Sequence, residues 1–287
     1  MVKQSNILIT GANGQLGRSI KKNSKNYNYN FFYMPKDKLD ISNYLALKKV
    51  IDKFKVDTII NCAAYTDVNK AETEKNKSDL INHKAVGFLA KYCSKNKIQL
   101  IHISTDYVFD GKKKIPYVES DKKNAVNYYG ITKAKGENIF LKYKLKNSII
   151  IRTSWLYSEY NYNFINQIID KVTKNKSIEI NIEQTGSLTN ANDLANVILE
   201  IMPKIKNKEP EIFHFSNSGI CNRFEIACKI NKLLNGSSKV EYNFKSDGNV
   251  VRPKFSALDS NKICHRFSIS NHNWMESLKN YLKNYKN

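Results

Sequence analysis

Short apolar runs rich in β-branched and aromatic residues alternate with amphipathic stretches through the first half of the chain. The apolar runs predict five strands, at residues 6–10, 30–34, 58–61, 99–104 and 148–153. The stretches between them predict four helices, at residues 15–22, 42–54, 78–94 and 127–143, and Ser42 and Ser78 are candidate N-caps. Strands that alternate with helices form parallel sheets through right-handed crossovers. The pattern therefore predicts an α/β protein built on a doubly wound parallel sheet.

The second half of the chain has a looser pattern of aromatic and polar segments. A late strand is predicted at residues 211–215 and a helix at residues 222–234. We expect residues 1–153 to form the sheet domain and residues 154–287 to form mainly a smaller C-terminal domain that binds substrate.

Three glycines follow the first predicted strand and open the first predicted helix. Gly11 permits a tight turn, Gly14 lets the backbone approach a pyrophosphate, and Gly17 allows close packing of the helix on the sheet. Amides at the helix N-terminus then hold the phosphate charge. The context predicts a Rossmann-type dinucleotide site, with a cofactor-binding loop made of Gly11, Asn13, Gly14, Gln15, Leu16 and Gly17.

The end of the second predicted strand should decide which nicotinamide cofactor binds. An acid there favours a free ribose 2′-hydroxyl, and a cation favours a 2′-phosphate. Lys36 is well placed for a 2′-phosphate, which favours NADPH, but it could equally be a solvated surface charge, so NADH stays an alternative. Asp40 and Ile41 follow closely, and Asp40 could bind the adenine amino group.

Two Tyr-x-x-x-Lys pairs occur, and their positions distinguish them. Tyr129 and Lys133 share one face of a predicted helix beyond the fourth strand, where parallel sheets place their active sites, so Lys133 could lower the pKa of the Tyr129 phenol. We predict that Tyr129 is the general acid and that the Thr105 hydroxyl binds the same carbonyl oxygen. Tyr44 with Lys48 lies in an early crossover helix, where packing is the better interpretation.

Composition narrows the classes of function. The net charge of +21 comes from 47 lysine and arginine residues against 26 acids, scattered along the chain, which favours a basic solvated surface over a nucleic-acid site. No apolar run approaches a membrane span, and the five cysteines lack Cys-x-x-Cys spacing. We expect a cytoplasmic enzyme with reduced thiols, no metal, and no nucleic-acid or membrane partner; a homodimer is left open.

Six segments in order along the chain resemble extended short-chain dehydrogenase/reductases, and within them the dTDP-4-dehydrorhamnose reductase family. GxxGxxG and YxxxK mark the whole superfamily, whereas STDYVFDG followed by YGxTKxxGE is specific to this branch. The matching segments are GANGQLG at 11–17, NCAAYTDVNKAE at 61–72, STDYVFDG at 104–111, YGITKAKGE at 129–137, RTSWLY at 152–157 and RPKFSAL at 252–258.

The resemblance implies NADPH-dependent reduction of the 4-keto group of dTDP-4-dehydro-L-rhamnose to dTDP-L-rhamnose, a deoxysugar of cell-surface polysaccharides. It implies Thr105, Tyr129 and Lys133 as the catalytic set, with Tyr129 and Lys133 also at the cofactor. It implies that the late strand near residue 213 returns to the nucleotide-binding domain, with returning segments near 163–200 and 211–230. It also places Ala63, Ala64 and Tyr65 along the cofactor, and Asp106, Tyr107 and Trp155 near the sugar.

The chain departs from the family pattern at three places. Ala125 and Leu188 stand where proline is common, and both lie in loops that shape the sugar pocket. The family's acidic residue after the glycine loop is missing from residues 18–21, which weakens the case for a magnesium-bridged dimer. Two alternatives therefore stay open: reduction of another nucleotide-linked 4-keto-6-deoxysugar, and a non-catalytic regulatory member of the same fold.

Overall fold

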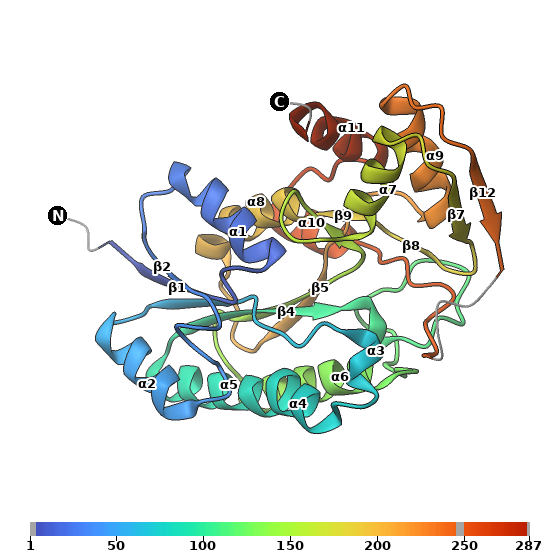
Figure 1. Ribbon diagram of the computed structural model, residues 1–287. Coiled ribbons are helices and arrows are strands. Elements are labelled where there is room, and N and C mark those ends of the chain that lie inside the picture. The colour runs from blue at the N-terminus through green and yellow to red at the C-terminus, as the bar shows by residue number, and fades with distance from the viewer. Residues whose placement is uncertain (1–3, 245–249, 286–287) are drawn as a thin grey trace.

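Six parallel strands form the central sheet of the computed structural model, which describes residues 4–244 and 250–285 (Figure 1). Their order across the sheet is β10-β5-β4-β3-β1-β2. The strands are β1 (Asn6–Thr10), β2 (Asn30–Met34), β3 (Thr58–Asn61), β4 (Gln99–Thr105), β5 (Ile149–Thr153) and β10 (Glu211–His214). The order reverses at β1, which pairs with β2 on one side and with β3 on the other. This is the doubly wound sheet that the sequence pattern predicts.

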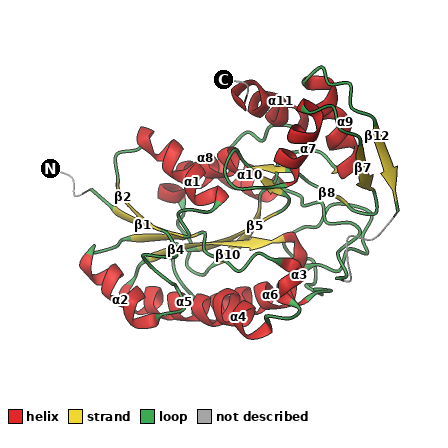
Figure 2. Ribbon diagram, viewed as in Figure 1, coloured by secondary structure: helices red, strands yellow, loops and turns green. Residues whose placement is uncertain are grey.

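Apolar side chains point from both faces of this sheet, because successive residues of a strand face opposite sides. Ile7 and Ile9 enter one buried cluster, whereas Leu8 between them enters the other. Helices cover both faces, as Figure 2 shows. One face carries α1 (Gln15–Asn23), α8 (Ala191–Ile201) and α10 (Asn261–Phe267). The other face carries α2 (Tyr44–Lys53), α5 (Ala85–Asn96) and α6 (Tyr128–Lys142).

A third buried cluster holds a smaller unit together beside the sheet (Figure 1). It contains α7 (Phe164–Thr173), α9 (Arg223–Leu233) and α11 (Trp274–Tyr285). Parallel strands β7 (Ile178–Asn181) and β12 (Val240–Asn243) close it. Two short strand pairs lie between this unit and the sheet: parallel β6 (Leu156–Tyr157) with β9 (Thr189–Asn190), and antiparallel β8 (Thr185–Gly186) with β11 (Cys221–Asn222).

The predicted strands and helices of the first half are confirmed, but both N-cap predictions are wrong. Asn43 caps α2 through its side-chain oxygen, and Ser42 instead donates to Asp40. Ser78 lies inside α4 (Lys75–Asp79) and hydrogen-bonds to Thr132. A π-helical turn, Leu80–Lys84, joins α4 to α5, so one continuous helical segment replaces the predicted helix at 78–94.

The chain passes more than once between the sheet and the smaller unit. α8 packs on α1 over the sheet and β10 pairs with β5, whereas α7 and α9 belong to the smaller unit. The division into domains at residue 153 stays a prediction. Within the described ranges, no helix is long and apolar enough to cross a membrane, and no group of His, Cys, Asp and Glu is arranged to hold a metal ion. All five cysteines are free.

Candidate active site

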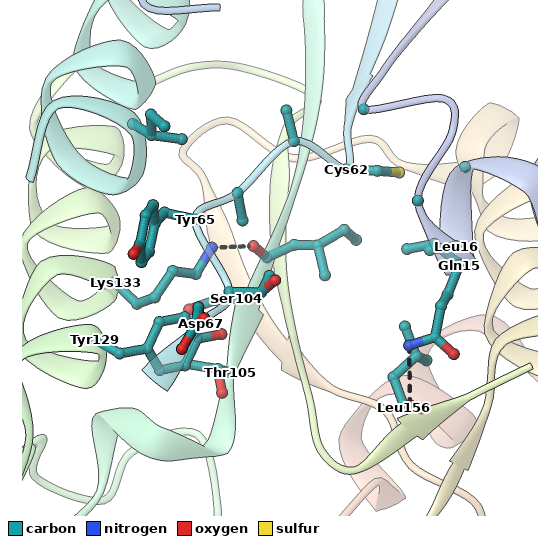
Figure 3. A pocket seen from close by; sticks show the side chains of 18 of the residues that line it. Gln15, Leu16, Cys62, Tyr65, Asp67, Ser104, Thr105, Tyr129, Lys133 and Leu156 are labelled. Atoms are coloured by element: carbon teal, nitrogen blue, oxygen red, sulfur yellow. Dashed lines mark hydrogen bonds between the residues drawn. The ribbon is translucent and has the colours of Figure 1, made fainter. Parts of the chain in front are cut away.

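One cavity of about 840 Å³ lies at the carboxyl ends of β1, β3, β4 and β5 (Figure 3). Open α/β sheets bind ligands at this edge, where the strand order reverses. The cavity brings together every residue that the sequence assigned to a site. They are Gly11, Asn13, Gly14, Gln15, Leu16, Gly17, Lys36, Asp40, Ile41, Ala63, Ala64, Tyr65, Thr105, Asp106, Tyr107, Tyr129, Lys133 and Trp155.

The glycine loop between β1 and α1 fits a dinucleotide diphosphate. Gly11 has φ +62°, and a Cβ there would lie 2.7 Å from the amide nitrogen of Ala63. A Cβ on Gly17 would lie 2.6 Å from the carbonyl oxygen of Gly11. Gly14 stands at the N-cap of α1 with no side chain capping the helix and no acid in its first turn. The positive end of the helix dipole is therefore left for an anion.

A segment of the smaller unit reaches across the start of α1. The Gln15 amide donates to the carbonyl oxygen of Leu156 at 3.3 Å, and its Oε1 accepts from Ser158 at 3.0 Å and from Asn163 at 3.1 Å. Lys22 forms an ion pair with Glu159 at 2.8 Å. The loop that would hold the diphosphate is thus tied directly to the part of the chain that follows Trp155.

The end of the cavity beyond β2 carries side chains of both signs of charge, as the sequence indicated. Lys36 and Asp40 both line it. Asp40 accepts hydrogen bonds from the Ser42 hydroxyl at 2.6 Å and from the Ser42 amide at 2.9 Å, which lower the pKa of its carboxyl. Oδ1 of Asp40 is therefore engaged by its own turn, and Lys36 places a positive charge at the same end of the cavity.

Gly130 lets the end of β4 pack tightly against the start of α6. A Cβ on Gly130 would lie 2.1 Å from the carbonyl oxygen of Tyr107, so no other residue fits without moving the turn. This approach places the Tyr107 ring edge-on to the Tyr129 ring, with centroids 5.7 Å apart. Thr105 ends β4 and donates to Asp106 at 3.0 Å. The close packing gathers Thr105, Asp106, Tyr107 and Tyr129 in one corner of the cavity.

Burial has the largest effect on the pKa of the Tyr129 phenol. The prediction that Lys133 lowers this pKa is wrong for this structure. Burial raises the pKa of Tyr129 well above its ordinary value, and hydrogen bonding to Thr105 acts in the opposite direction without overcoming it. The Lys133 ammonium instead donates to the carbonyl oxygen of Ile103 at 2.6 Å (Figure 3). A phenol with a raised pKa stays protonated at neutral pH, which suits a proton donor.

Lys133 is almost fully buried, and burial lowers its pKa to about 8. The charge of Glu137 acts in the opposite direction. Tyr44 and Lys48, the other Tyr-x-x-x-Lys pair, lie away from the cavity. The Tyr44 ring packs against Phe88 with centroids 5.6 Å apart, and Lys48 pairs with Asp52, which confirms the packing interpretation.

Trp155, which lies between β5 and β6, has a strained backbone. Its φ of +41° lies in the left-handed region, which bulky residues rarely adopt. A Cβ on Gly186 would lie 2.9 Å from the Trp155 ring, so the indole sits against bare backbone. Trp155 lines the cavity, and its place near the sugar stays a prediction. Strain of this kind persists where surrounding packing enforces it.

Asn82 has a positioning role that sequence reasoning missed. Its Oδ1 accepts from the Tyr65 amide at 2.9 Å, and its Nδ2 donates to the Tyr65 carbonyl at 3.0 Å. The two bonds fix the segment Ala63–Ala64–Tyr65 that borders the cavity. Asn82 reaches it because it lies in the π-helical turn, a feature that often marks functional sites. Asp67 and Lys70 also line the cavity, and the NCAAYTDVNKAE segment contained them.

Asp106 provides a test of the site's electrostatics. Its side chain is buried, and burial raises the pKa of its carboxyl to about 6, so the ionised form destabilises the fold above that pH. We expect Asp106→Asn to raise the free energy of unfolding by up to about 3 kcal/mol near pH 8. At about pH 3 most folded and unfolded carboxyls are protonated, so the gain should largely disappear there. Urea unfolding followed by circular dichroism at the two pH values measures it.

Asp110→Asn is the matched control for this variant. Hydrogen bonds from Lys112 and Asn124 contribute to a lowered pKa for Asp110, so its charge stabilises the fold at neutral pH. This control should lose stability near pH 8. A loss of stability in Asp106→Asn at the same pH would contradict the prediction.

The sheet, the glycine loop and the Tyr129/Lys133 pair define the class of this protein. They make it a nicotinamide-dependent oxidoreductase with a Rossmann-type sheet. Within that class, the chain belongs to the family described as the RmlD substrate binding domain, whose model matches residues 5–287.

Named relatives cover almost the whole chain. A dTDP-4-dehydrorhamnose reductase of Aggregatibacter actinomycetemcomitans is 36% identical and aligns with 96% of this chain and 97% of its own length. A dTDP-4-keto-6-deoxy-D-glucose reductase of Streptomyces niveus is 32% identical, covering 88% of this chain and 87% of its own. A dTDP-4-dehydrorhamnose reductase structure from Bacillus anthracis, in complex with NADP, is 31% identical with a TM-score of 0.92, covering 98% of this chain and all of that one.

Proposed function

We propose that the chain reduces the 4-keto group of dTDP-4-dehydro-L-rhamnose with NADPH and forms dTDP-L-rhamnose for cell-surface polysaccharide. One observation carries the proposal. The Tyr129 phenol and the Lys133 ammonium line the same cavity as the glycine loop, at the edge of the sheet where ligands bind. The relatives with this activity in their names match the chain over nearly its whole length.

Different residues of the cavity would contact different parts of the cofactor. The diphosphate would lie on the loop at residues 11–17, and the adenosine end would reach Lys36, Asp40 and Ile41. Ala63, Ala64 and Tyr65 would border the nicotinamide half, whose ribose Lys133 would contact. NADPH supplies the hydride when bound. Lys36 would bind the 2′-phosphate, which supports NADPH over NADH.

Tyr129 moves the proton of the reaction. As the keto oxygen gains negative charge, the phenol donates its proton to that oxygen, and the Thr105 hydroxyl holds the oxygen in place. Asp106, Tyr107 and Trp155 would surround the sugar. Asp106 is buried and lines the cavity, so its carboxyl would accept a hydrogen bond from a sugar hydroxyl there.

A second function stays close to the first. The Streptomyces niveus relative is named for dTDP-4-keto-6-deoxy-D-glucose, so the sugar could be another dTDP-linked 4-keto-6-deoxyhexose. A non-catalytic role is less well supported, because Thr105, Tyr129 and Lys133 all keep their places around the cavity.

The purified protein, NADPH and both 4-keto sugars test the proposal directly. We expect loss of reduced-nicotinamide absorbance with dTDP-4-dehydro-L-rhamnose, and dTDP-L-rhamnose as the product by NMR. Faster reduction of the other sugar would establish the second function, and no reduction of either would reject both. Repeating the assay with NADH checks the contribution of Lys36.

The reaction would take place in the cytoplasm. Reduced cysteines are typical of that compartment, and all five cysteines of the chain are free. A homodimer stays a prediction, which light scattering of the purified protein would check.

A further inference from the structure

Behind the cavity, a fully buried carboxylate joins the catalytic helix to two strands of the sheet. Glu137 lies one helical turn after Lys133 on α6. Its Oε1 accepts from the Ser104 hydroxyl at 2.7 Å and from Arg152 Nε at 2.8 Å. Its Oε2 accepts from Arg152 Nη2 at 2.8 Å and lies 3.1 Å from the Lys123 ammonium. Ser104 precedes Thr105 in β4, and Arg152 lies in β5.

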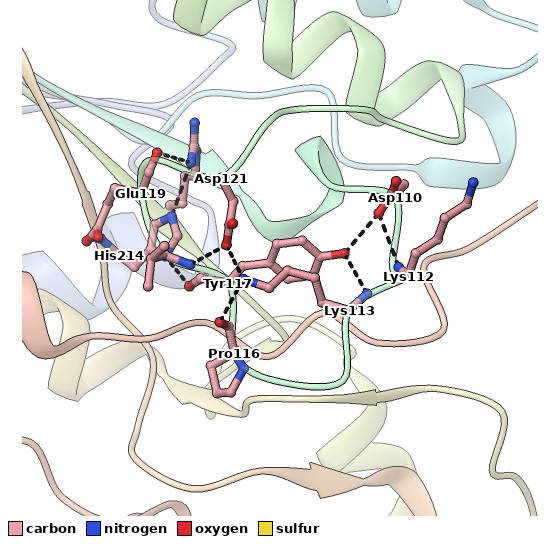
Figure 4. A network of polar contacts seen from close by, with 10 residues as sticks. Asp110, Lys112, Lys113, Pro116, Tyr117, Glu119, Asp121 and His214 are labelled. Carbon is pink, nitrogen blue, oxygen red and sulfur yellow. Dashed lines mark hydrogen bonds and ion pairs between the residues drawn. The ribbon is translucent and has the colours of Figure 1, made fainter.

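Arg152 is held from its other side as well. Arg152 Nη1 can only donate, so His214 Nε2 accepts at 3.2 Å and His214 Nδ1 donates to the carbonyl oxygen of Tyr117 at 3.0 Å. The His214 amide donates to Glu119 at 2.8 Å. Figure 4 shows this histidine beside the loop of residues 110–121, which the Lys113–Asp121 ion pair and the Tyr117–Asp110 hydrogen bond brace. The guanidinium therefore has little freedom to move.

The charges around Glu137 are mostly positive. Burial acts to raise the pKa of Glu137, but hydrogen bonds and the charge of Arg152 lower it, so Glu137 is ionised. Burial lowers the pKa of His214 to about 3, and burial also lowers the pKa of His102, which faces Lys133 from β4, so both histidines are neutral. Arg152, Lys123 and Lys133 thus share one carboxylate.

We propose that Glu137 is a positioning residue for the reduction: its carboxylate fixes the end of β4 against the catalytic helix and supplies negative charge to the buried side of Lys133. The inference rests on the proposed function, because it concerns Lys133, which would contact the nicotinamide ribose. Through Ser104 it sets the place of Thr105, and through its charge it keeps Lys133 protonated at neutral pH. Glu137 itself does not line the cavity within the described residues.

The pH dependence of turnover separates this role from a structural one. If Lys133 must be protonated, the rate falls as pH rises through its pKa of about 8. We expect Glu137→Gln to move this falling limb to lower pH by roughly one unit, because the attraction of the carboxylate is lost. A merely structural defect would lower the rate at every pH and leave the limb in place, and that result would overturn the proposal.

Two further variants keep the test interpretable. Glu137→Gln leaves Arg152 without its partner, so a double variant with Arg152→Met removes both charges if the single one does not fold. The double variant should show the same shifted limb, because Arg152 is not among the groups that shift the pKa of Lys133. Lys123→Gln is the matched control: it changes a cation on the same carboxylate, and the limb should not move to lower pH.

A second readout does not depend on which sugar is reduced. Calorimetry of NADP⁺ binding in two buffers of different ionisation enthalpy, near pH 8, measures the protons exchanged. In the wild type Lys133 is partly protonated, so the number of protons exchanged on binding should differ from that of Lys133→Met. Glu137→Gln should exchange about as many protons as Lys133→Met. Equal exchange in Glu137→Gln and wild type, or in wild type and Lys133→Met, would overturn the inference. If wild type reduces neither sugar, the proposed function fails while this readout still decides the role of Glu137.

Discussion

Tyr129→Phe should lose turnover by about 10²- to 10⁴-fold, the contribution typical of a general acid. The variant keeps the ring that packs edge-on against Tyr107, so the corner of the cavity should be unchanged. Only the phenolic hydroxyl is lost, and the keto oxygen must then take its proton from water. Single-turnover oxidation of bound NADPH in the presence of the sugar measures the effect on the chemical step.

Cofactor affinity is the control for Tyr129→Phe. The dissociation constant for NADPH, from fluorescence titration, should stay within about twofold of wild type because binding is dominated by other groups. Tyr128→Phe is the matched variant: Tyr128 is the neighbouring residue of α6 and does not line the cavity in the described structure. It should turn over normally. A near wild-type rate for Tyr129→Phe would remove the phenol from the mechanism.

Lys133→Ala should reduce both turnover and cofactor affinity. A charged hydrogen bond to the cofactor contributes about 1.5–3 kcal/mol, so we expect NADPH to bind roughly 10- to 100-fold more weakly. Turnover should fall by a further factor of about 10² or more, because the nicotinamide ribose that Lys133 would contact is no longer held in place for hydride transfer. Fluorescence titration and steady-state rates measure the two effects separately.

Lys133→Met shows whether the effects of Lys133→Ala come from the lost charge or from the lost side-chain volume. Lys133 is almost fully buried, so alanine leaves a void that can itself disturb α6, whereas methionine fills most of the space without charge. Both variants should lose affinity to a similar extent. Unchanged NADPH binding in Lys133→Met would show that Lys133 does not contact the cofactor.

The sheet, the glycine loop and the Tyr129/Lys133 pair could be predicted because each depends on a local pattern, whereas the residues expected near the sugar were implied only by the family resemblance. Alternating strands and helices predicted the parallel sheet, and the spacing of Gly11, Gly14 and Gly17 after a strand predicted the loop that the structure shows. The placement of Tyr129 and Lys133 needed only the rule that sites lie at the carboxyl ends of parallel strands. These features survive because tertiary contacts reinforce the local preference.

Features that depend on long-range packing were not predictable from the sequence. The lysine ammonium turns to the carbonyl of Ile103 because burial leaves it few acceptors, and no spacing in the sequence reveals that contact. Ser42 and Ser78 have the right residue type for an N-cap. Their hydroxyls instead hydrogen-bond to the side chains of Asp40 and Thr132. The π-helical turn at Asn82 likewise follows from packing against α6, because a Cβ on Gly136 would lie 2.2 Å from the Asn82 carbonyl oxygen.

The repeated passage of the chain between the sheet and the smaller unit limits how the molecule can be cut. A fragment ending at Thr153 would lack β10, so β5 would become an unprotected edge strand open to pairing with other chains. It would also lack α8, which leaves apolar residues such as Ile20 and Ile151 exposed to water. Such a fragment is expected to aggregate, so residues 1–153 should not fold as an independent unit.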